Sequence, residues 1–373
     1  MDKKVLLFVT GTRADFGKME PLAREAFNNG FKVIFFVTGM HMMREYGLTK
    51  EEVHKNKDIQ IFEFSNQKYG DKLDTILSNT VRGFSNYVKE INPDIVIIHG
   101  DRIEAIACSL VCSTNNIISA HIEGGEVSGT IDEVFRHCNT KLCTFHLVSS
   151  NEAKKRVRQM GEPEKNIFVI GSPELDIHGR KSGVDLLQVK ERYKIDFKEY
   201  GICIFHPVTT EENQIKIQAE NLFKSLSISN RNFVIILPNN DPGSIYICNE
   251  IDKLNSNNFR IIPSMRFNYF SELMKNSSLI IGNSSLGVRE APFLGIMSIN
   301  IGTRQNKRAL TQSIYNCSGQ SIPEIVDAIG KFWNKKTTSH KGFGSGNSRK
   351  KFLKFINSDK IWNQSTQKSF EEL

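Results

Sequence analysis

The feature that most constrains the fold is a series of short apolar runs, each followed by a polar turn, alternating with stretches of helical periodicity. Apolar runs of this length are typical of strands that are buried on both faces. Strands of this kind, separated by helices, form doubly wound parallel sheets. The runs of the first half lie at 5–10, 32–37, 59–64, 94–99, 116–122, 145–150 and 167–172, and those of the second half lie at 201–210, 232–241, 259–265, 278–285 and 297–303.

The length of 373 residues exceeds what one ordinary hydrophobic core holds, so we expect two domains. Each series of strands predicts one Rossmann-like domain, and the two domains are expected to face a shared cleft. The polar, glycine-rich segment 171–183 is the predicted linker. The chain is therefore predicted to be an α/β protein whose last part, beyond about residue 322, is mainly helical.

Composition restricts the possible partners. A hydrophobic share of 39% and a charged share of 24% are typical of a soluble globular protein. The net charge of +8 suits either nucleic acid or an anionic small molecule. Most lysines are scattered, and the densest cluster, at 348–354, is explained by a solvated helix face. Because no nucleic-acid-binding motif is present, we expect no nucleic acid partner.

The seven cysteines are interpreted as reduced thiols, several of them small buried hydrophobes. Their spacings lack the two-residue gaps of a zinc knuckle, so no metal is expected. The N-terminal apolar run is too short for a signal peptide, and no run reaches the length of a membrane span. We therefore expect a cytoplasmic protein that does not contact a membrane.

The stretch from residue 99 to residue 137 is the densest concentration of chemistry in the chain. Asp101 and Glu123 each follow a predicted strand, and ligands of parallel sheets bind beyond the carboxyl ends of the strands. The loop GGEVSGT lets Asp132 return toward the same place. Carboxyl groups that converge in this way are suited to proton transfer at neutral pH. The alternative interpretation is that these acids only cap helices and line solvated turns.

The turn after the first strand carries Arg13, a planar cation suited to a phosphate, and the alternative interpretation is a surface arginine. Gly11 and Gly17 give a loosened version of a dinucleotide-binding fingerprint. The Gly-x-Gly-x-x-Gly spacing is absent, however, and the next strand ends in Thr38 and Gly39 without an acid for a ribose. The sequence therefore does not predict a nicotinamide site.

The second half offers groups that bind anions. Ser284 and Ser285 lie where a helix is predicted to begin, so their hydroxyls and backbone N–H groups are suited to a phosphate, or Ser284 simply caps the helix. Glu290, in the same predicted helix, is suited to the two hydroxyls of a ribose or is a solvated acid. His206 and Arg304 each follow a strand. Cations and N–H groups thus dominate the second half and acids the first, which matches a nucleoside diphosphate joined to a neutral sugar.

These segments together resemble the UDP-N-acetylglucosamine 2-epimerase family, on the hydrolysing branch that releases N-acetylmannosamine for sialic acid synthesis. The order and spacing of the segments carry the resemblance more than any single one does. The matching segments run from residue 10 to residue 308 and are TGTRADFGK, VTGMHMM, IHGDR, HIEGGEVSGTIDEVFRH, IGSPELD, FHPVTT, PNNDPGS, GNSSLGVREAP and GTRQNKR, and WNQSTQKSF near the C-terminus also fits.

The resemblance implies two Rossmann-like domains in the glycosyltransferase-B arrangement, with the active site in the interdomain cleft. It places the catalytic carboxylates in residues 1–175, UDP binding in residues 176–350, and a helix that crosses back to the first domain in residues 351–373. It implies a UDP-sugar substrate, neither a metal nor a nicotinamide cofactor, and a homodimer or higher homo-oligomer.

Site residues are carried over by motif. Asp101, Glu123 and Asp132 match the catalytic carboxylates of the family. Glu290 matches the ribose ligand, and the serines and arginines match positions near the diphosphate. The full set that matches positions holding UDP or its sugar is Arg13, Arg102, His206, Asn239, Ser284, Ser285, Glu290 and Arg304.

Smaller sequence differences bear on which branch of this family the chain resembles and on which UDP-sugar it is expected to use. The non-hydrolysing branch carries Gln-His-Arg after its second strand for an allosteric sugar nucleotide, whereas this chain has Gly39-Met40-His41-Met42. This difference indicates the hydrolysing branch. A sister enzyme that acts on UDP-2,4-diacetamido-2,4,6-trideoxyglucose (UDP-N,N'-diacetylbacillosamine) for legionaminic acid synthesis has nearly the same motifs and is the alternative. A glycosyltransferase-B sugar transferase, which would share the fold, is a more distant one.

Overall fold

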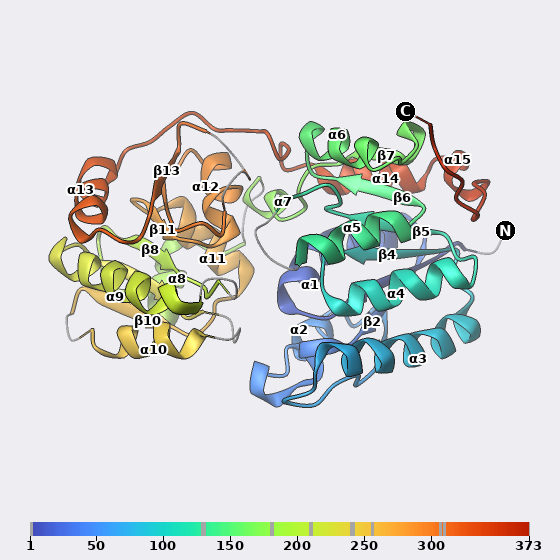
Figure 1. Ribbon diagram of the computed structural model, residues 1–373, viewed down its shortest axis with the longest axis horizontal. Helices are drawn as coiled ribbons and strands as arrows, with labels where there is room; N and C mark the ends of the chain where they lie inside the picture. The colour runs from blue at the N-terminus through green and yellow to red at the C-terminus, as the bar shows by residue number, and fades with distance from the viewer. Residues whose placement is uncertain are drawn as a thin grey trace. The chain divides into compact units, whose positions relative to one another are not determined.

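The computed structural model describes residues 3–127, 132–179, 183–208, 212–238, 243–254, 257–305, 308 and 311–372. The chain divides into two compact units (Figure 1). The first unit lies within Met1–Glu126, Ile131–Asp176 and Gly342–Leu373, and the second lies mainly within Ile177–Lys341. The described residues of each unit form one parallel sheet with helices on both faces, as the alternating pattern of the sequence predicts.

The sheet of the first unit has seven strands in the order β3-β2-β1-β4-β5-β6-β7, and every pair of neighbours is parallel. The order reverses between β1 and β4, and this reversal is the place where ligands of doubly wound sheets bind. The strands are β1 (Val5–Thr10), β2 (Lys32–Val37), β3 (Gln60–Glu63), β4 (Ile95–His99), β5 (Ser119–Ile122), β6 (Phe145–Val148) and β7 (Ile167–Val169).

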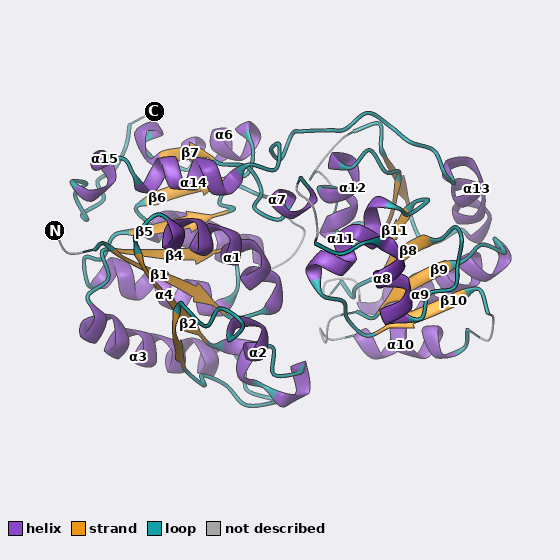
Figure 2. Cartoon of the chain, turned by 180° about the vertical axis from the view of Figure 1, so that it is seen from behind, coloured by secondary structure: helices purple, strands orange, loops and turns teal. Residues whose placement is uncertain are grey.

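The strands are covered by helices on both faces, so successive residues of most strands are buried. This explains why these strands appear in the sequence as continuous apolar runs. In β1, Leu6 and Phe8 pack into the core on one face, and Leu7 and Val9 pack into the core on the other. Figure 2 shows the strands of this unit between two layers of helices. The helices are α1 (Arg13–Asn28), α2 (Lys50–Val53), α3 (Leu73–Ile91), α4 (Ile103–Thr114), α5 (Asp132–Leu142), α6 (Asn151–Gln159), α14 (Ser348–Ile356) and α15 (Asp359–Trp362).

The return of the chain to the first unit begins earlier than the expected residue 351, because the residues from Gly342 onward already belong to that unit. The backbone N–H of Ser172 donates to the carbonyl of Phe343 at 2.7 Å. The carboxylate of Asp176 accepts from the N–H groups of Ser348 and Arg349, at 2.8 Å each, and so caps α14. These bonds fasten the returning segment both ahead of its first helix and at the first turn of that helix.

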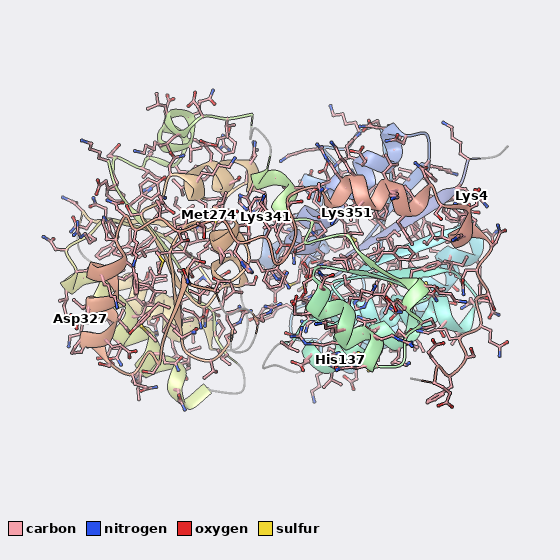
Figure 3. The ribbon with its side chains drawn as sticks, turned by 90° about the horizontal axis from the view of Figure 1, so that it is seen from above. Lys4, His137, Met274, Asp327, Lys341 and Lys351 are labelled. Carbon is pink, nitrogen blue, oxygen red and sulfur yellow. The ribbon has the colours of Figure 1, made fainter. Side chains whose placement is uncertain are left out.

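Helix α14 explains the basic cluster of the sequence. Phe352, the most deeply buried residue of the helix together with Ile356, meets the ring of Phe8 edge-on, with the ring centroids 6.0 Å apart. The lysines of the helix, including the labelled Lys351, lie at the surface (Figure 3). The cluster is therefore the solvated face of an amphipathic helix, as predicted.

The sheet of the second unit has six parallel strands in the order β10-β9-β8-β11-β12-β13, which repeats the order of the first unit. Its strands are β8 (Gly201–Ile204), β9 (Phe233–Ile236), β10 (Phe259–Ile262), β11 (Ile280–Gly282), β12 (Ser298–Ile301) and β13 (Ile314–Cys317). Its helices are α8 (Leu186–Tyr193), α9 (Glu212–Ile228), α10 (Ser244–Asp252), α11 (Phe267–Lys275), α12 (Glu290–Phe293) and α13 (Ile322–Phe332), and the short helix α7 (Leu175–His178) lies where the chain passes from the first unit to the second.

Strand β13 is the one strand of this sheet that the sequence did not predict. Its residues, Ile-Tyr-Asn-Cys, include only one that is fully buried, so the apolar run is too weak to be seen. The strand pairs with β12 on one side and forms the edge of the sheet. Among the described helices, none has both the length and the apolar content that crossing a membrane requires.

Five of the seven cysteines, which are Cys108, Cys112, Cys143, Cys203 and Cys317, are buried. Burial raises the pKa of the Cys143 and Cys317 thiols to about 12, so both stay protonated. These cysteines behave as small core residues, as expected from their apolar surroundings.

Candidate active site

Glu123 has the most unusual environment of the expected acids. It directly follows β5, and its backbone has a φ of +67°, a left-handed conformation that is uncommon for residues other than glycine. Its side chain is only 7% exposed. Lys18 Nζ lies 3.0 and 3.1 Å from the two carboxylate oxygens, Ser172 Oγ donates to Oε1 at 2.9 Å, and His99 Nε2 lies 3.3 Å from Oε2. A strained backbone that fixes a buried acid among polar groups is typical of a functional site.

A second buried acid, Glu174, contacts the same lysine. Its Oε2 lies 3.2 Å from Lys18 Nζ, and its side chain is 4% exposed. Lys18 comes from α1, whereas Glu174 comes from the turn that follows β7 and precedes α7. The ammonium group therefore lies between two carboxylates that the sequence places far apart.

Asp101 lies in the turn between β4 and α4, where a buried arginine holds it. Nη2 of Arg136, on α5, donates to Asp101 Oδ2, and Nη1 donates to the carbonyl of Glu126 at 3.0 Å. The turn itself is held at the carbonyl of Gly100, which accepts from the ring of His121 at 2.7 Å and from Asn139 at 3.1 Å. Two partners on one carbonyl, and a third on the carboxylate, fix the position of Asp101.

His121 is a neutral structural residue. Complete burial lowers its pKa to about 3, since a charged imidazole would lose its hydration. Because the carbonyl of Gly100 can only accept, Nε2 carries the proton, and Nδ1 faces Thr140 Oγ1 at 3.2 Å. His121 therefore supports the turn that carries Asp101 and does not need to exchange protons.

Asp132 is the first residue of α5 and is exposed. It precedes Arg136 by one helical turn, so the two residues share a face of the helix. Since Arg136 pairs with Asp101, the start of α5 lies beside the turn of Asp101. Asp101 and Glu123 in turn follow neighbouring strands, which are in register through His99 and Ile122. The structure thus places Asp101 and Glu123 at the carboxyl ends of the neighbouring strands β4 and β5, and Asp132 lies one helical turn before the arginine that binds Asp101.

In the turn after β1, two backbone N–H groups already have a side-chain partner. Asp15 Oδ2 accepts from the N–H groups of Gly11 and Thr12 at 2.8 and 2.9 Å, which are the donors that a pyrophosphate would use in a nicotinamide-binding fold. Arg13 follows as the half-buried first residue of α1. Arg102 is exposed, and its Nε lies 3.5 Å from Oε2 of the buried Glu104.

His41, in the segment that differs from the Gln-His-Arg motif, is part of the core. Nε2 lies 2.9 Å from Thr10 Oγ1 and Nδ1 lies 2.8 Å from Thr49 Oγ1. Burial lowers its pKa. Its neighbour Gly39 has a φ of +62°, and a Cβ there would lie 2.7 Å from the carbonyl oxygen of Gly11, so only glycine fits.

In the second unit, Asn283 joins the expected residues. It follows β11, and its side chain accepts from the backbone N–H of His206 at 2.7 Å and donates to the carbonyl of His206 at 2.8 Å. Its own carbonyl accepts from Arg304 Nη1 at 3.1 Å and from Gln305 at 2.8 Å. The buried Asn283 thus connects three places in the second unit. These are the ends of β8 and β11, between which the strand order reverses, and the turn after β12.

The helix expected after Ser284 is shorter than predicted. Ser285–Gly287 form one 3-10 turn, and α12 follows after Arg289 with four residues. The Ser284 side chain makes no capping hydrogen bond to that turn, so the interpretation as a plain helix cap is wrong. Any anion here would be held by hydroxyls and local N–H groups, because so short a helix adds little dipole.

Glu290 is buried, so its interpretation as a solvated helix acid is wrong. Its Oε1 lies 2.9 Å from His178 Nε2, and His178 Nδ1 lies 2.9 Å from Ser271 Oγ. The carboxylate is therefore oriented by a histidine that is itself fixed by a hydroxyl. Asn239, the remaining expected residue, lies outside the described residues.

Sequence reasoning missed several residues that the structure places beside the expected ones. Their segments were recognised, since TGTRADFGK contains Lys18, IGSPELD contains Ser172 and Glu174, and GNSSLGVREAP contains Asn283. No role could be given to them, because their partners are distant in the chain.

The fold and these residues together describe a two-unit doubly wound α/β protein, with a buried acidic cluster in one unit and a buried, histidine-bound carboxylate in the other. A family model described as UDP-N-acetylglucosamine 2-epimerase matches residues 24–357. The chain therefore belongs to the UDP-N-acetylglucosamine 2-epimerase family.

Individual relatives agree with this assignment. The chain is 42% identical to a UDP-N-acetylglucosamine 2-epimerase of Neisseria meningitidis serogroup B, over 99% of both chains. It is 30% identical to the hydrolysing UDP-N,N'-diacetylbacillosamine 2-epimerase of Legionella pneumophila, over 94% of this chain and 95% of the relative. A solved structure of the Methanocaldococcus jannaschii UDP-GlcNAc 2-epimerase with UDP-GlcNAc and UDP has a TM-score of 0.80 at 20% identity, over 94% of this chain and 99% of that one. The expected fold class, two Rossmann-like domains, is confirmed.

Proposed function

We propose that the protein is a hydrolysing UDP-N-acetylglucosamine 2-epimerase, which converts UDP-N-acetylglucosamine and water to N-acetylmannosamine and UDP. The observation that carries the proposal is Glu123, a buried acid in a left-handed backbone conformation that is held by Lys18, His99 and Ser172. An acid fixed in this way, within a family of sugar-nucleotide epimerases, is suited to move the proton of a sugar carbon.

The chemistry proceeds in two steps. A carboxylate of the first unit removes the proton at C2 while the C1–O bond to UDP breaks, which gives 2-acetamidoglucal and UDP. Water then adds to the double bond, with its oxygen at C1 and a proton delivered to C2 from the other face. Two different carboxyls are needed, one for each face of the ring, and Asp101, Glu123 and Asp132 are the three candidates for these two roles.

Departure of UDP requires that its developing negative charge be stabilised. In the second unit, Arg304 is held against the turn of Asn283, next to Ser284 and Ser285, and is suited to the diphosphate. Glu290, oriented by His178, is suited to the ribose hydroxyls. Arg13, Arg102, His206 and Asn239 complete the proposed substrate-binding set.

The hydrolysing outcome is supported by two points. The segment Gly39–Met42 differs from the Gln-His-Arg motif of the non-hydrolysing branch, and its His41 is committed to the core. The Legionella relative is named as a hydrolysing enzyme, and its substrate gives the alternative proposal, UDP-N,N'-diacetylbacillosamine. The 42% identity to the Neisseria epimerase favours UDP-N-acetylglucosamine.

One experiment tests both substrate and chemistry. The purified protein is incubated with each UDP-sugar in D2O enriched in heavy-oxygen water, and the products are followed at once by NMR and mass spectrometry. We expect a mannosamine-type product with deuterium at C2 and the heavy oxygen at C1, and unlabelled UDP. Retention of the C2 hydrogen would indicate hydride transfer, and label in UDP would indicate phosphate hydrolysis. Either result would contradict the proposal.

A further inference from the structure

We infer that Glu174 is a positioning residue for proton transfer, which acts through Lys18 on Glu123. The inference rests on the proposed function of the site. The turn between β7 and α7 carries two side chains that reach the site, since Ser172 Oγ donates to Glu123 and Glu174 pairs with Lys18. The same turn is fastened from behind by Asp176, which caps α14.

Charge explains why a second carboxylate is useful. If Lys18 faced Glu123 alone, the ammonium would hold Glu123 in its ionised form and oppose its protonation. Glu174 contacts the same Nζ and offsets that charge. Lys18 is 18% exposed and both acids are 7% exposed or less, so water screens these charges only weakly. Because one ammonium group faces two carboxylates, one negative charge of the three groups is not balanced. A proton can therefore still be taken up by one of the carboxylates.

Among the residues that the structure describes, His99 and Ser172 also contact Glu123 but do not replace Glu174. His99, at the end of β4, lies 3.3 Å from Oε2 and supplies a second nitrogen rather than a negative charge. The Ser172 hydroxyl is neutral. Asp101, in the turn after β4, forms an ion pair with Arg136 of α5, so the positive charge of Arg136 offsets the negative charge of Asp101. Among the described partners, Glu174 is therefore the acid that balances the charge of Lys18.

The direction of the expected effect does not depend on the role of Glu123. Removal of the Glu174 charge takes away a negative charge that offsets Lys18, so the proton affinity of Glu123 falls. The limb of the kcat/KM profile that reports this group moves to lower pH, whether Glu123 works as a base or as an acid. Removal of the Lys18 charge moves the same limb to higher pH. We expect shifts of about one pH unit, the lower end of what a neighbouring charge produces.

The test is the pH profile of kcat/KM for Glu174→Gln and for Lys18→Gln, with the product assay run on the parent protein first. Glu174→Asp keeps the charge and should keep the parent profile. Glu162→Gln is the matched control, because Glu162 is a buried, lysine-paired acid beside His146, at the amino end of β6 and away from the carboxyl ends of the strands. Over the pH range in which this less stable variant stays folded, its kcat/KM profile should match the parent profile.

Opposite shifts for the two variants would support the inference, and an unmoved or upward-shifted Glu174→Gln profile would overturn it. If Glu174→Gln fails to fold, Lys18→Met/Glu174→Met replaces the ion pair by an apolar pair. Its profile should then lie between those of the parent and Lys18→Gln, and a profile equal to that of Lys18→Gln would overturn the inference. If the parent itself releases no mannosamine-type product, the proposed function fails, which is a different result.

Discussion

The three acids of the first unit differ in their surroundings, although each is expected to be needed. Glu123 contacts a lysine that a second acid shares, Asp101 is paired with the buried Arg136, and Asp132 is exposed at the start of α5. These differences suit a reaction that removes a proton on one face of a sugar and delivers one on the other.

At this scale we predict that Asp101→Asn, Glu123→Gln and Asp132→Asn each lower kcat by about 10²-fold or more, because loss of a general acid or base typically costs that much. The affinity for UDP, measured by calorimetry, should change little, since these acids are not expected to hold the nucleotide. Three folded variants that turn over within a few-fold of the parent would show that the acids are assigned wrongly.

A second residue-scale prediction concerns the nucleotide. Arg304→Ala, and separately the double change Ser284→Ala/Ser285→Ala, should weaken UDP binding by about 1–3 kcal/mol, as expected for hydrogen bonds to a charged group. Arg231→Ala is a suitable control, because Arg231 is exposed and stacks over Trp333 in the same unit. Calorimetric affinities that match the parent for both variants would remove the anion site from these two turns.

At the scale of elements, the C-terminal segment is a part of the first unit. The side chains of α14 complete the core beneath β1, and Asp176 caps the helix by accepting from two backbone N–H groups. The residue that fastens α14 lies two positions from Glu174, so one short turn serves both the core and the site.

We therefore predict that Asp176→Ala destabilises the protein by about 1–2 kcal/mol, the usual cost of losing a helix cap. Asp359→Ala, which removes an exposed acid from the first turn of α15, should have a much smaller effect. The measurement is the urea midpoint of each variant. Hydrogen exchange should also locate the loss of protection in α14 for Asp176→Ala, and equal stability of the two variants would argue against the cap.

At the scale of the whole molecule, we expect the free energy of unfolding to depend on pH through a buried cluster of ionisable side chains around Glu162. Glu162 has a fully buried side chain that contacts Lys141 at 2.7 Å, His146 at 2.9 Å and Lys368 at 2.5 Å. Burial alone would raise its pKa, but the hydrogen bonds and charges of these partners outweigh burial and lower the pKa of Glu162 to about 2. Lys368 comes from the C-terminal end of the chain, so the cluster also fastens that end.

A lowered carboxyl pKa stabilises the folded state at every pH above the unfolded value, and the stabilisation is lost as pH falls through the folded value. A fall from 4.5 to about 2 corresponds to about 3 kcal/mol. We predict that Glu162→Gln loses roughly this free energy of unfolding at pH 7, and that the difference from the parent shrinks between pH 4.5 and pH 2. Urea denaturation across this range measures it, and a difference independent of pH would contradict the assignment.

Local sequence patterns were enough to predict the class of fold and the segments of the chain in which to look for the site. Strand runs such as 5–10 and 94–99 are visible because buried parallel strands are apolar on both faces, which is a local property. The acids that follow these strands were identified because polar residues at strand ends stand out against the apolar runs. The family segments then fixed which acids and arginines to consider.

The contacts between residues that are distant in the sequence became visible only in the three-dimensional fold. Lys18 and Glu174 are far apart in the sequence. They meet because α1 and the turn after β7 both follow strands of the same sheet at the carboxyl ends of those strands. Asn283 joins β8 to β11 because the strand order reverses there. Strand β13 forms from a weakly apolar segment because β12 offers it a free edge to pair with. Contacts of this kind depend on long-range packing, which no local pattern of residues encodes.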